Sequence, residues 1–197
     1  MPNHYIMRKY FLILALALIC TGAAAQKVTL NERDEHGDRN IETGFRGFYV
    51  DGHLHMCQLC YVEHEDNEFY ILSFAFSDQA SSWKALEGQE LMMKDEQDNV
   101  LTIQSFGVST STLSRDTKNR GGVSYLCSTR YYLTKEQAEI IRNGLIKLRV
   151  NITYDNTDVK SMFDVEIPAD LTAYLKKAIK NIDKTIPMPV SVDKSVF

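Results

Sequence analysis

The stretch FYILSFAF, residues 69–76, decides the fold class of this chain. Its large apolar side chains recur at every second position, which is the period of an extended strand. One face of that strand carries Tyr70, Leu72, Phe74 and Phe76. The opposite face carries Phe69, Ile71 and Ala75. Because both faces are apolar, we expect a central strand of a sheet, covered by protein on both sides.

Polar runs on both sides of this strand predict hairpin connections. Upstream, Glu63–Asn67 follows the segment 45–62, which is rich in aromatic and β-forming residues. Downstream, Asp95–Asn99 separates two short apolar runs, 91–94 and 100–106. Short polar turns between apolar runs are typical of antiparallel strands.

Two segments in the middle of the chain carry other patterns. Residues 81–87 hold the one tryptophan, Trp83, and are expected to form a short turn or helix. Residues 107–120 are rich in serine and threonine, which is typical of a loop. A Gly-Gly pair ends this loop, and residues 123–133 are expected to form another strand.

The C-terminal part begins with a helix signal. Thr134 is a good N-cap, and Gln137 three residues later can complete a capping box, so we expect a short helix near 134–143. Gly144 is a usual stop signal. Apolar and polar residues then alternate over 145–154, which predicts a strand.

A final strand is expected over 162–167, and a second helix near 169–183. The apolar stripe of this helix is Leu171, Leu175, Ala178, Ile179 and Ile182. The whole pattern predicts an α+β fold: a mainly antiparallel β-sheet with a short helix near 134–143 and a C-terminal helix near 169–183.

Residues 1–25 have the three parts of a cleavable secretory signal peptide. Arg8 and Lys9 supply its positive end, and an apolar core of about 10 residues follows, against the roughly 20 that a membrane-spanning helix needs. Ala23-x-Ala25 fits a signal peptidase site. Met7 begins a more typical signal than Met1 does, so it is an alternative start.

The mature chain is then expected to begin at Gln26 and to work in the periplasm, at the cell surface or outside the cell. Residues 26–43 are polar and crowded with charge, so we interpret them as a flexible leader. Residues 44–197 are long enough for a single α+β domain with a core.

The charge of the mature chain argues against nucleic-acid binding. Signal cleavage removes two of the 22 basic residues and no acidic one, so 20 basic residues stand against 26 acidic ones, a net charge of −6. Nucleic-acid binding relies on basic surface, so this class of partner is not expected. No second apolar run is long enough to span a bilayer.

One constellation suggests metal chemistry. Five potential ligands fall close together: His53, His55, Cys57, Cys60 and His64. If residues 53–62 form a strand, His53 and His55 share a face, and the following hairpin brings Asp78 near His53. These groups are ligands of zinc, so a His53/His55/Asp78 zinc site is one hypothesis. The alternative is a strand face with exposed histidines.

The mature cysteines allow two further hypotheses. Cys57-x-x-Cys60 has the spacing of a redox pair, but no helix pattern follows it, and in a strand the two Cα atoms would be about 10 Å apart. A structural disulfide is the other hypothesis, because exported proteins form them. Cys127 can pair with Cys57 or with Cys60, and we favour a bond between Cys60 and Cys127.

Three features resemble the small exported proteins of Bacteroides-type bacteria. The Ala-x-Ala site is followed directly by Gln26, and Glu42-Thr-Gly-Phe-Arg-Gly-Phe48 is similar to a segment near the start of their mature chains. The third feature is the block Tyr132–Ala138 followed by Gly144–Val150, a helix and then a strand. The resemblance implies an envelope or secreted protein and carries over no catalytic residue.

The sequence holds no recognised catalytic motif. The leading hypothesis is therefore a non-catalytic binding or structural module of the bacterial envelope, with an envelope protein or a glycan as partner. The loop 107–120 and the tyrosines 125, 131 and 132 are candidate contact surfaces. The alternative is a metal-binding protein or metal-dependent hydrolase using His53 and His55.

Overall fold

The computed structural model describes residues 28–34, 37–50, 53–65, 67–78, 83–110, 112–116, 122–154, 160–188 and 191–192. The predicted signal peptide lies outside the described residues. The strands are β1 (Val28–Arg33), β2 (Arg39–Thr43), β3 (Arg46–Val50), β4 (His53–His64), β5 (Asn67–Asp78), β6 (Trp83–Ala85), β7 (Glu90–Asp95), β8 (Val100–Phe106), β9 (Ser109–Thr110), β10 (Thr112–Asp116), β11 (Gly122–Leu133), β12 (Leu145–Tyr154), β13 (Lys160–Glu166) and β14 (Ser191–Val192). The helices of this part of the chain are α2 (Glu139–Asn143) and α3 (Ala169–Thr185).

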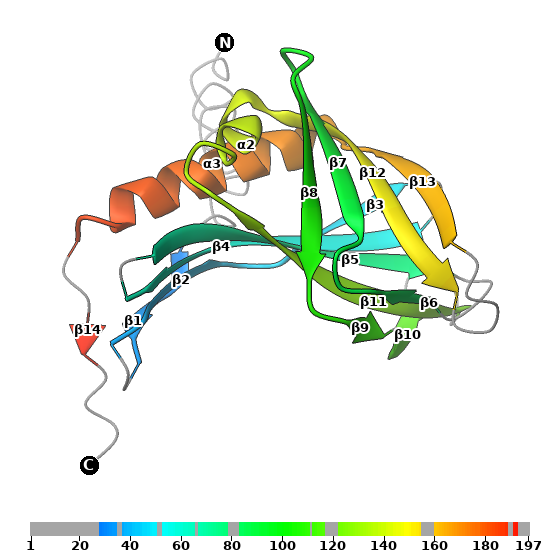
Figure 1. Cartoon of the computed structure of the whole chain (residues 1–197), viewed down its shortest axis with the longest axis horizontal. Helices are drawn as coiled ribbons and strands as arrows, with labels where there is room; N and C mark the ends of the chain where they lie inside the picture. Colours follow the sequence, from blue (N-terminus) through cyan, green and yellow to red (C-terminus); the bar gives the residue numbers. More distant parts are fainter. Residues whose placement is uncertain are drawn as a thin grey trace, which may run out of the picture.

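The strands form one sheet that is mostly antiparallel, as the sequence predicts. Its order is β14-β1-β2-β4-β5-β11-β8-β7-β12-β6-β9, with β3 beside β4, β10 beside β11, and β13 beside β12. Only two residue pairs, Arg130 with Phe106 and Tyr131 with Ser105, join β11 to β8. At this junction the sheet folds over, so that β7, β8 and β12 stand across β4, β5 and β11 (Figure 1).

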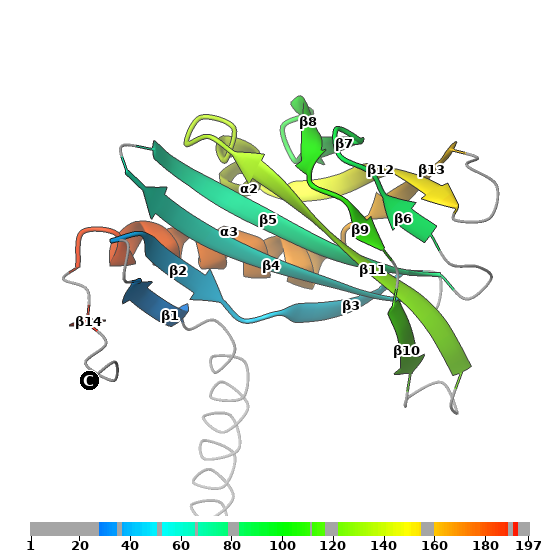
Figure 2. The same cartoon turned by 60° about the horizontal axis from the view of Figure 1, so that its bottom comes forward.

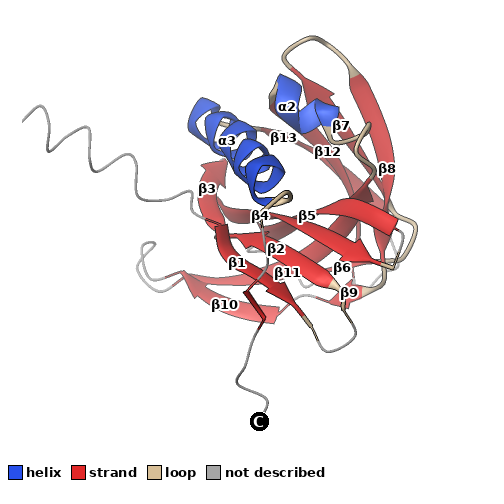
Figure 3. Ribbon diagram, turned by 90° about the vertical axis from the view of Figure 1, so that its left-hand side faces the viewer, coloured by secondary structure: helices blue, strands red, loops and turns tan. Residues whose placement is uncertain are grey.

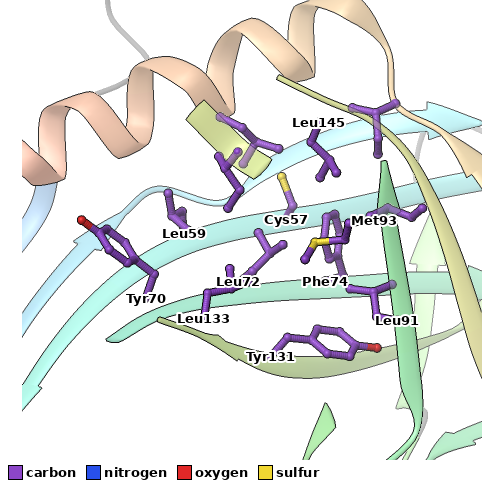
Figure 4. Close-up of a cluster of buried hydrophobic side chains, with 14 of the residues drawn as sticks. Cys57, Leu59, Tyr70, Leu72, Phe74, Leu91, Met93, Tyr131, Leu133 and Leu145 are labelled. Carbon is purple, nitrogen blue, oxygen red and sulfur yellow. The ribbon is translucent and has the colours of Figure 1, made fainter. Parts of the chain in front are cut away.

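The core fills the space inside this fold, and β5 is its central strand. Leu72 lies opposite Leu59 on β4 and Tyr131 on β11, so β5 is paired on both edges. The inward residues of β5 are Tyr70, Leu72, Phe74 and Phe76, each at most 1% exposed. Leu91 and Met93 of β7 face them from the other half of the sheet (Figure 4).

The outward face of β5 differs from the prediction. Ala75 is buried at 5% exposed, but Phe69 and Ile71 are only half-buried, and among the described residues no second layer covers them. The apolar pattern was interpreted as burial on both faces, but here it marks one face in the core and one face beside an open groove.

The predicted hydrogen bonds between Thr134 and Gln137 are present, but they lie in the turns before the short helix, whose own N-cap is Ala138 without a side-chain hydrogen bond. The backbone N–H of Thr134 donates to Oε1 of Gln137 at 3.0 Å, and the backbone N–H of Gln137 donates to Oγ1 of Thr134 at 3.2 Å. Residues 135–138 form turns before α2 begins at Glu139. Gly144 ends the helix with a φ of 105°, which favours glycine.

The C-terminal helix is confirmed, and it closes one side of the core. All five residues of its predicted stripe are buried. Arg46 of β3 pairs with Asp170 at 3.1 Å, and Thr172 donates to the carbonyl of Leu145 on β12 at 2.7 Å. These contacts fix α3 to strands from both halves of the sheet. Figure 3 shows α2 and α3 together on the same side of β4 and β5.

The predicted leader is wrong from residue 28 onward. β1 and β2 belong to the sheet, and β2 pairs with β4 from Arg39–Glu63 to Glu42–Cys60. Ile41 is fully buried and Arg39 is 4% exposed. The guanidinium of Arg39 donates to the carbonyls of residues 185, 186 and 188 at the end of α3. The segment looks polar because few of its side chains reach the core, and one of those is an arginine.

Two other expectations are corrected. Trp83 lies in the strand β6, not in a turn or helix, and is 1% exposed. The expected loop 107–120 contains β9 and β10, and β10 pairs with β11 from Thr112–Leu126 to Asp116–Gly122. Serine and threonine are compatible with both loops and strands, so composition alone misassigned this segment.

Candidate functional site

The predicted cluster of histidines and cysteines lies along β4. Because side chains alternate between the faces of a strand, His55 turns toward the core and His64 toward the outer face. His55 is 5% exposed, and its ring lies 5.4 Å from that of Phe48 and 5.7 Å from that of Phe76. The expectation of an exposed histidine is therefore wrong for His55, which packs in the core.

A zinc site formed by His53, His55 and Asp78 stays a prediction, because the side chains of His53 and Asp78 lie outside the described residues. His53 and Asp78 belong to the neighbouring strands β4 and β5, which pair from Met56–Ala75 to His64–Asn67. Among the side chains that the structure describes, no three or more of the ligand types His, Cys, Asp and Glu are grouped to hold a metal ion.

No disulfide joins Cys57, Cys60 and Cys127, which are all buried. Cys60 faces the outer side opposite Ile71 of β5, whereas Cys127 faces the core opposite Phe76. Those two positions on β5 are about 16 Å apart at about 3.3 Å per residue, against a limit of about 7 Å for a disulfide. The favoured Cys60–Cys127 bond is therefore not formed in this fold.

The environment of Cys57 and Cys60 also disfavours redox chemistry. Burial raises the pKa of each thiol to about 12, because it disfavours the charged thiolate. The two thiols lie on opposite faces of β4. Since the thiolate is the reactive species, neither cysteine is set up for exchange.

The outer face of β2, β4, β5 and β11 holds a groove of about 390 Å³. Figure 2 turns this face toward the viewer, with α3 behind the sheet. Strand pairing arranges its side chains in rows across the sheet. One row is Glu42, Cys60, Ile71 and Tyr132. The next row is Gln58, Ser73 and Arg130.

The acidic side chains of the groove lie along β2, and their neighbours engage them. The carboxylate of Glu42 accepts a hydrogen bond from the amide of Asn40 at 2.8 Å and a longer one from Gln58 at 3.5 Å. The carboxylate of Asp38 lies 2.6 Å from Nδ1 of His64. That hydrogen bond raises the pKa of His64 above its ordinary value, because it favours the charged imidazolium.

Arg130 stands on the opposite side of the groove, on β11. Its side chain is exposed, and within the described part of the chain it makes no hydrogen bond or ion pair. Burial and the charge of Glu42 raise the pKa of Cys60 on the groove floor, and the charge of Arg130 lowers it. Among the described residues, the groove therefore offers one guanidinium without a hydrogen-bonding or ion-pair partner.

Aromatic rings line the groove from several elements. The rings of Phe69 and Tyr132 meet edge to face at 4.9 Å, and Phe106 of β8 continues the row at 4.8 Å from Tyr132. Phe106 is 59% exposed, and Phe45, also in the groove wall, is 57% exposed. Exposed rings beside polar groups give a ligand an apolar surface and hydrogen-bonding partners together.

A second cluster of titratable groups joins three elements. Arg142 of α2 donates to Asp183 of α3 at 3.1 and 3.2 Å and to the hydroxyl of Tyr70 on β5 at 3.0 Å. The hydroxyl of Tyr70 donates to Asp183 at 2.5 Å. All three groups satisfy one another, so this cluster clamps α2 and α3 to β5 and leaves no group to act on a ligand.

A smaller hollow of about 250 Å³ lies on β7, β8 and β12. Its cations are already paired: Arg149 contacts Asp164 at 2.7 and 3.1 Å, and Lys147 contacts Asp164 at 3.0 Å and Glu166 at 2.9 Å. The contrast with Arg130 makes the larger groove the better candidate site.

The sequence pointed to only part of this site. Tyr132 was among the candidate contact residues and lines the groove, whereas Tyr131, beside it, is 1% exposed and faces the core. Gln58, Ser73 and Arg130 were missed. Their only local signal is the alternation of polar and apolar residues along their strands, which any solvent-facing strand also shows.

Comparison with known proteins gives no family for this chain. No protein-family model, no curated protein and no solved structure matches it. Among the described residues, no helix has the length and apolar character to cross a membrane.

Proposed function

We propose that this protein is an exported, non-catalytic binding module of the bacterial envelope, and that the outer groove holds a glycan. The observation that carries the proposal is the side-chain chemistry of the groove. Amide, hydroxyl, carboxylate and guanidinium groups lie beside exposed aromatic rings. Sugar hydroxyls both donate and accept hydrogen bonds, and the C–H faces of sugars pack on aromatic rings.

The size of the groove favours a glycan over an envelope protein. A stable protein interface covers about 800 Å² on each partner and has an apolar centre. The groove is a short hollow of about 390 Å³ whose floor carries Cys60, Ile71 and Ser73 between walls of mixed polar and aromatic side chains. A chain of a few sugar rings fits such a concave, mixed surface better than a flat protein face does.

Binding without catalysis is supported by the state of the two carboxylates. Asp38 is engaged by His64, and Glu42 is engaged by Asn40. Both acids lie on the β2 side, and among the described residues that line the groove no carboxylate faces them from the β11 side, where a glycosidase would place its second carboxyl group. Export is supported by the signal-peptide pattern of residues 1–25 and by the resemblance to small envelope proteins.

A groove-filling variant tests the proposal. Ser128 is exposed on β11 in the groove wall, and tryptophan is well tolerated in strands, so Ser128→Trp should fill the groove without unfolding the sheet. We expect the wild-type protein to bind members of an envelope and plant glycan panel, and the variant to lose at least about tenfold in affinity.

The matched control is Ala173→Trp. Ala173 is exposed on α3, on the other side of the sheet, so this variant adds the same ring away from the groove. It should bind as the wild type does, with unchanged circular dichroism for both variants. Absence of binding to every glycan in the panel, or equal loss in both variants, would contradict the proposed site.

A further inference from the structure

We infer that the glycan held by the outer groove is acidic, and that its carboxylate binds the guanidinium of Arg130. This inference rests on the proposed function and adds a substrate class to it: saccharides that contain uronic acids.

The argument begins with the partners of the arginines. Every other arginine whose side chain is described is engaged within the protein. Arg33 pairs with Glu63, Arg46 with Asp170, Arg142 with Asp183 and Arg149 with Asp164, while Arg39 binds the end of α3. Among these described side chains Arg130 alone has no partner. A guanidinium beside a groove, whose donors no described residue engages, matches the planar geometry of a carboxylate.

The two acidic side chains of the groove do not occupy the place beside Arg130 where the carboxylate of a ligand would bind. Asp38 and Glu42 are engaged by their own neighbours on the β2 side. β4 and β5 lie between β2 and β11, and Glu42 and Arg130 stand in adjacent rows, so their backbones are about 16 Å apart, at about 4.8 Å per strand spacing and about 7 Å per row. This exceeds the screening length of about 8 Å at physiological salt, so Glu42 weakly repels an anion bound at Arg130.

The surroundings of Arg130 suit a sugar ring that carries the carboxylate. Ser128 and Tyr132 flank it on the same face of β11, and Ser73 lies opposite it on β5. Residues two apart on a strand are separated by about 7 Å. A uronic acid can therefore set its carboxylate on Arg130, its ring against Tyr132 and its hydroxyls toward Ser73 and Ser128.

The net charge of the protein does not favour acidic ligands over neutral ones. The mature chain that we expect after signal cleavage has a net charge of −6, so it offers no general attraction to anions. A preference for acidic over neutral saccharides would then come from a local contact and not from the long-range field of the protein.

Calorimetric titration with paired ligands tests the inference. The probes are oligomers of galacturonate, mannuronate and glucuronate-containing saccharides, each beside its methyl-esterified form, which removes the charge and keeps the sugar. We expect at least one acid to bind roughly tenfold or more tightly than its ester, the effect of one charge-assisted hydrogen-bonded pair. Arg130→Gln should abolish that preference, and Arg149→Gln, a paired arginine outside the groove, should keep it.

The outcomes separate this inference from the proposed function. Binding of esters or neutral glycans as tightly as acids would overturn the acidic class and leave the glycan groove standing. An acid preference that survives Arg130→Gln would overturn the role of Arg130. No binding of any saccharide, acidic or neutral, would overturn the proposed function and this inference together.

Discussion

The two faces of β4, β5 and β11 have the same backbone and opposite roles. On the inner face, Leu72 and its neighbours pack against β7 and α3 and are almost fully buried. On the outer face, Ile71 is half-buried and shares a groove with Ser73 and Arg130. The difference shows that adjacent residues of one strand can have different roles: one packs in the core and stabilises the fold, and the next lines a groove.

The inner face carries a buried arginine, and the fold engages it. Arg39 turns inward from β2 and binds three carbonyls beyond the last turn of α3. The outer face carries Arg130, which has no such partner in the described chain. The arginine of the inner face therefore stabilises the fold, whereas the arginine of the outer face is a candidate ligand contact.

The largest expected effect is the difference in stability between two alanine variants, one at Leu72 on the inner face and one at Ile71 on the outer face. Leu72→Ala creates a cavity in the core and should lower the free energy of unfolding by about 2–5 kcal/mol. Ile71→Ala removes a half-buried side chain from the groove and should cost about 1 kcal/mol. Urea denaturation of both variants measures the difference. Equal losses would mean that the outer face is packed as tightly as the core.

A smaller difference in stability is expected between alanine variants of Arg39 and of Asn40, its neighbour on β2. Arg39→Ala leaves the carbonyls at the end of α3 without their donor and should cost about 2 kcal/mol. Asn40→Ala changes a groove residue and should cost about 0.5 kcal/mol or less. The same denaturation assay applies. A negligible loss for Arg39→Ala would restore the interpretation of this segment as a leader outside the fold.

The sequence predicted the elements whose signals are local. Thr134 and Gln137 are three residues apart, and the helix stripe from Leu171 to Ile182 repeats within one helix, so both were confirmed. Arg39 was missed because its partners lie about 150 residues further along the chain. Short polar strands such as β2 become recognisable only through the strands they pair with.

The groove could not be predicted for the same physical reason. Its central row is built from Gln58, Ser73 and Arg130, and only the pairing of β4 with β5 and of β5 with β11 brings them together. A shift of one residue in either register would turn one member of the row toward the core. Local alternation indicates which residues share a face, but not which residues of different strands become neighbours.

The smallest effect concerns His64 and Asp38 at one end of the groove, where His64 is exposed. The hydrogen bond to Asp38 raises the pKa of His64, so an NMR titration should give a midpoint above the ordinary value of about 6.5. Because the folded state has the higher pKa, the contribution to stability is complete below about pH 6.5 and is lost as the pH rises through the raised pKa. Asp38→Asn should return the midpoint toward the ordinary value, and Glu65→Gln, which removes a weaker influence, should shift it less. An unshifted midpoint in the wild type would show that Asp38 is not held at His64, and one of the groove's two acids would then be open to a ligand.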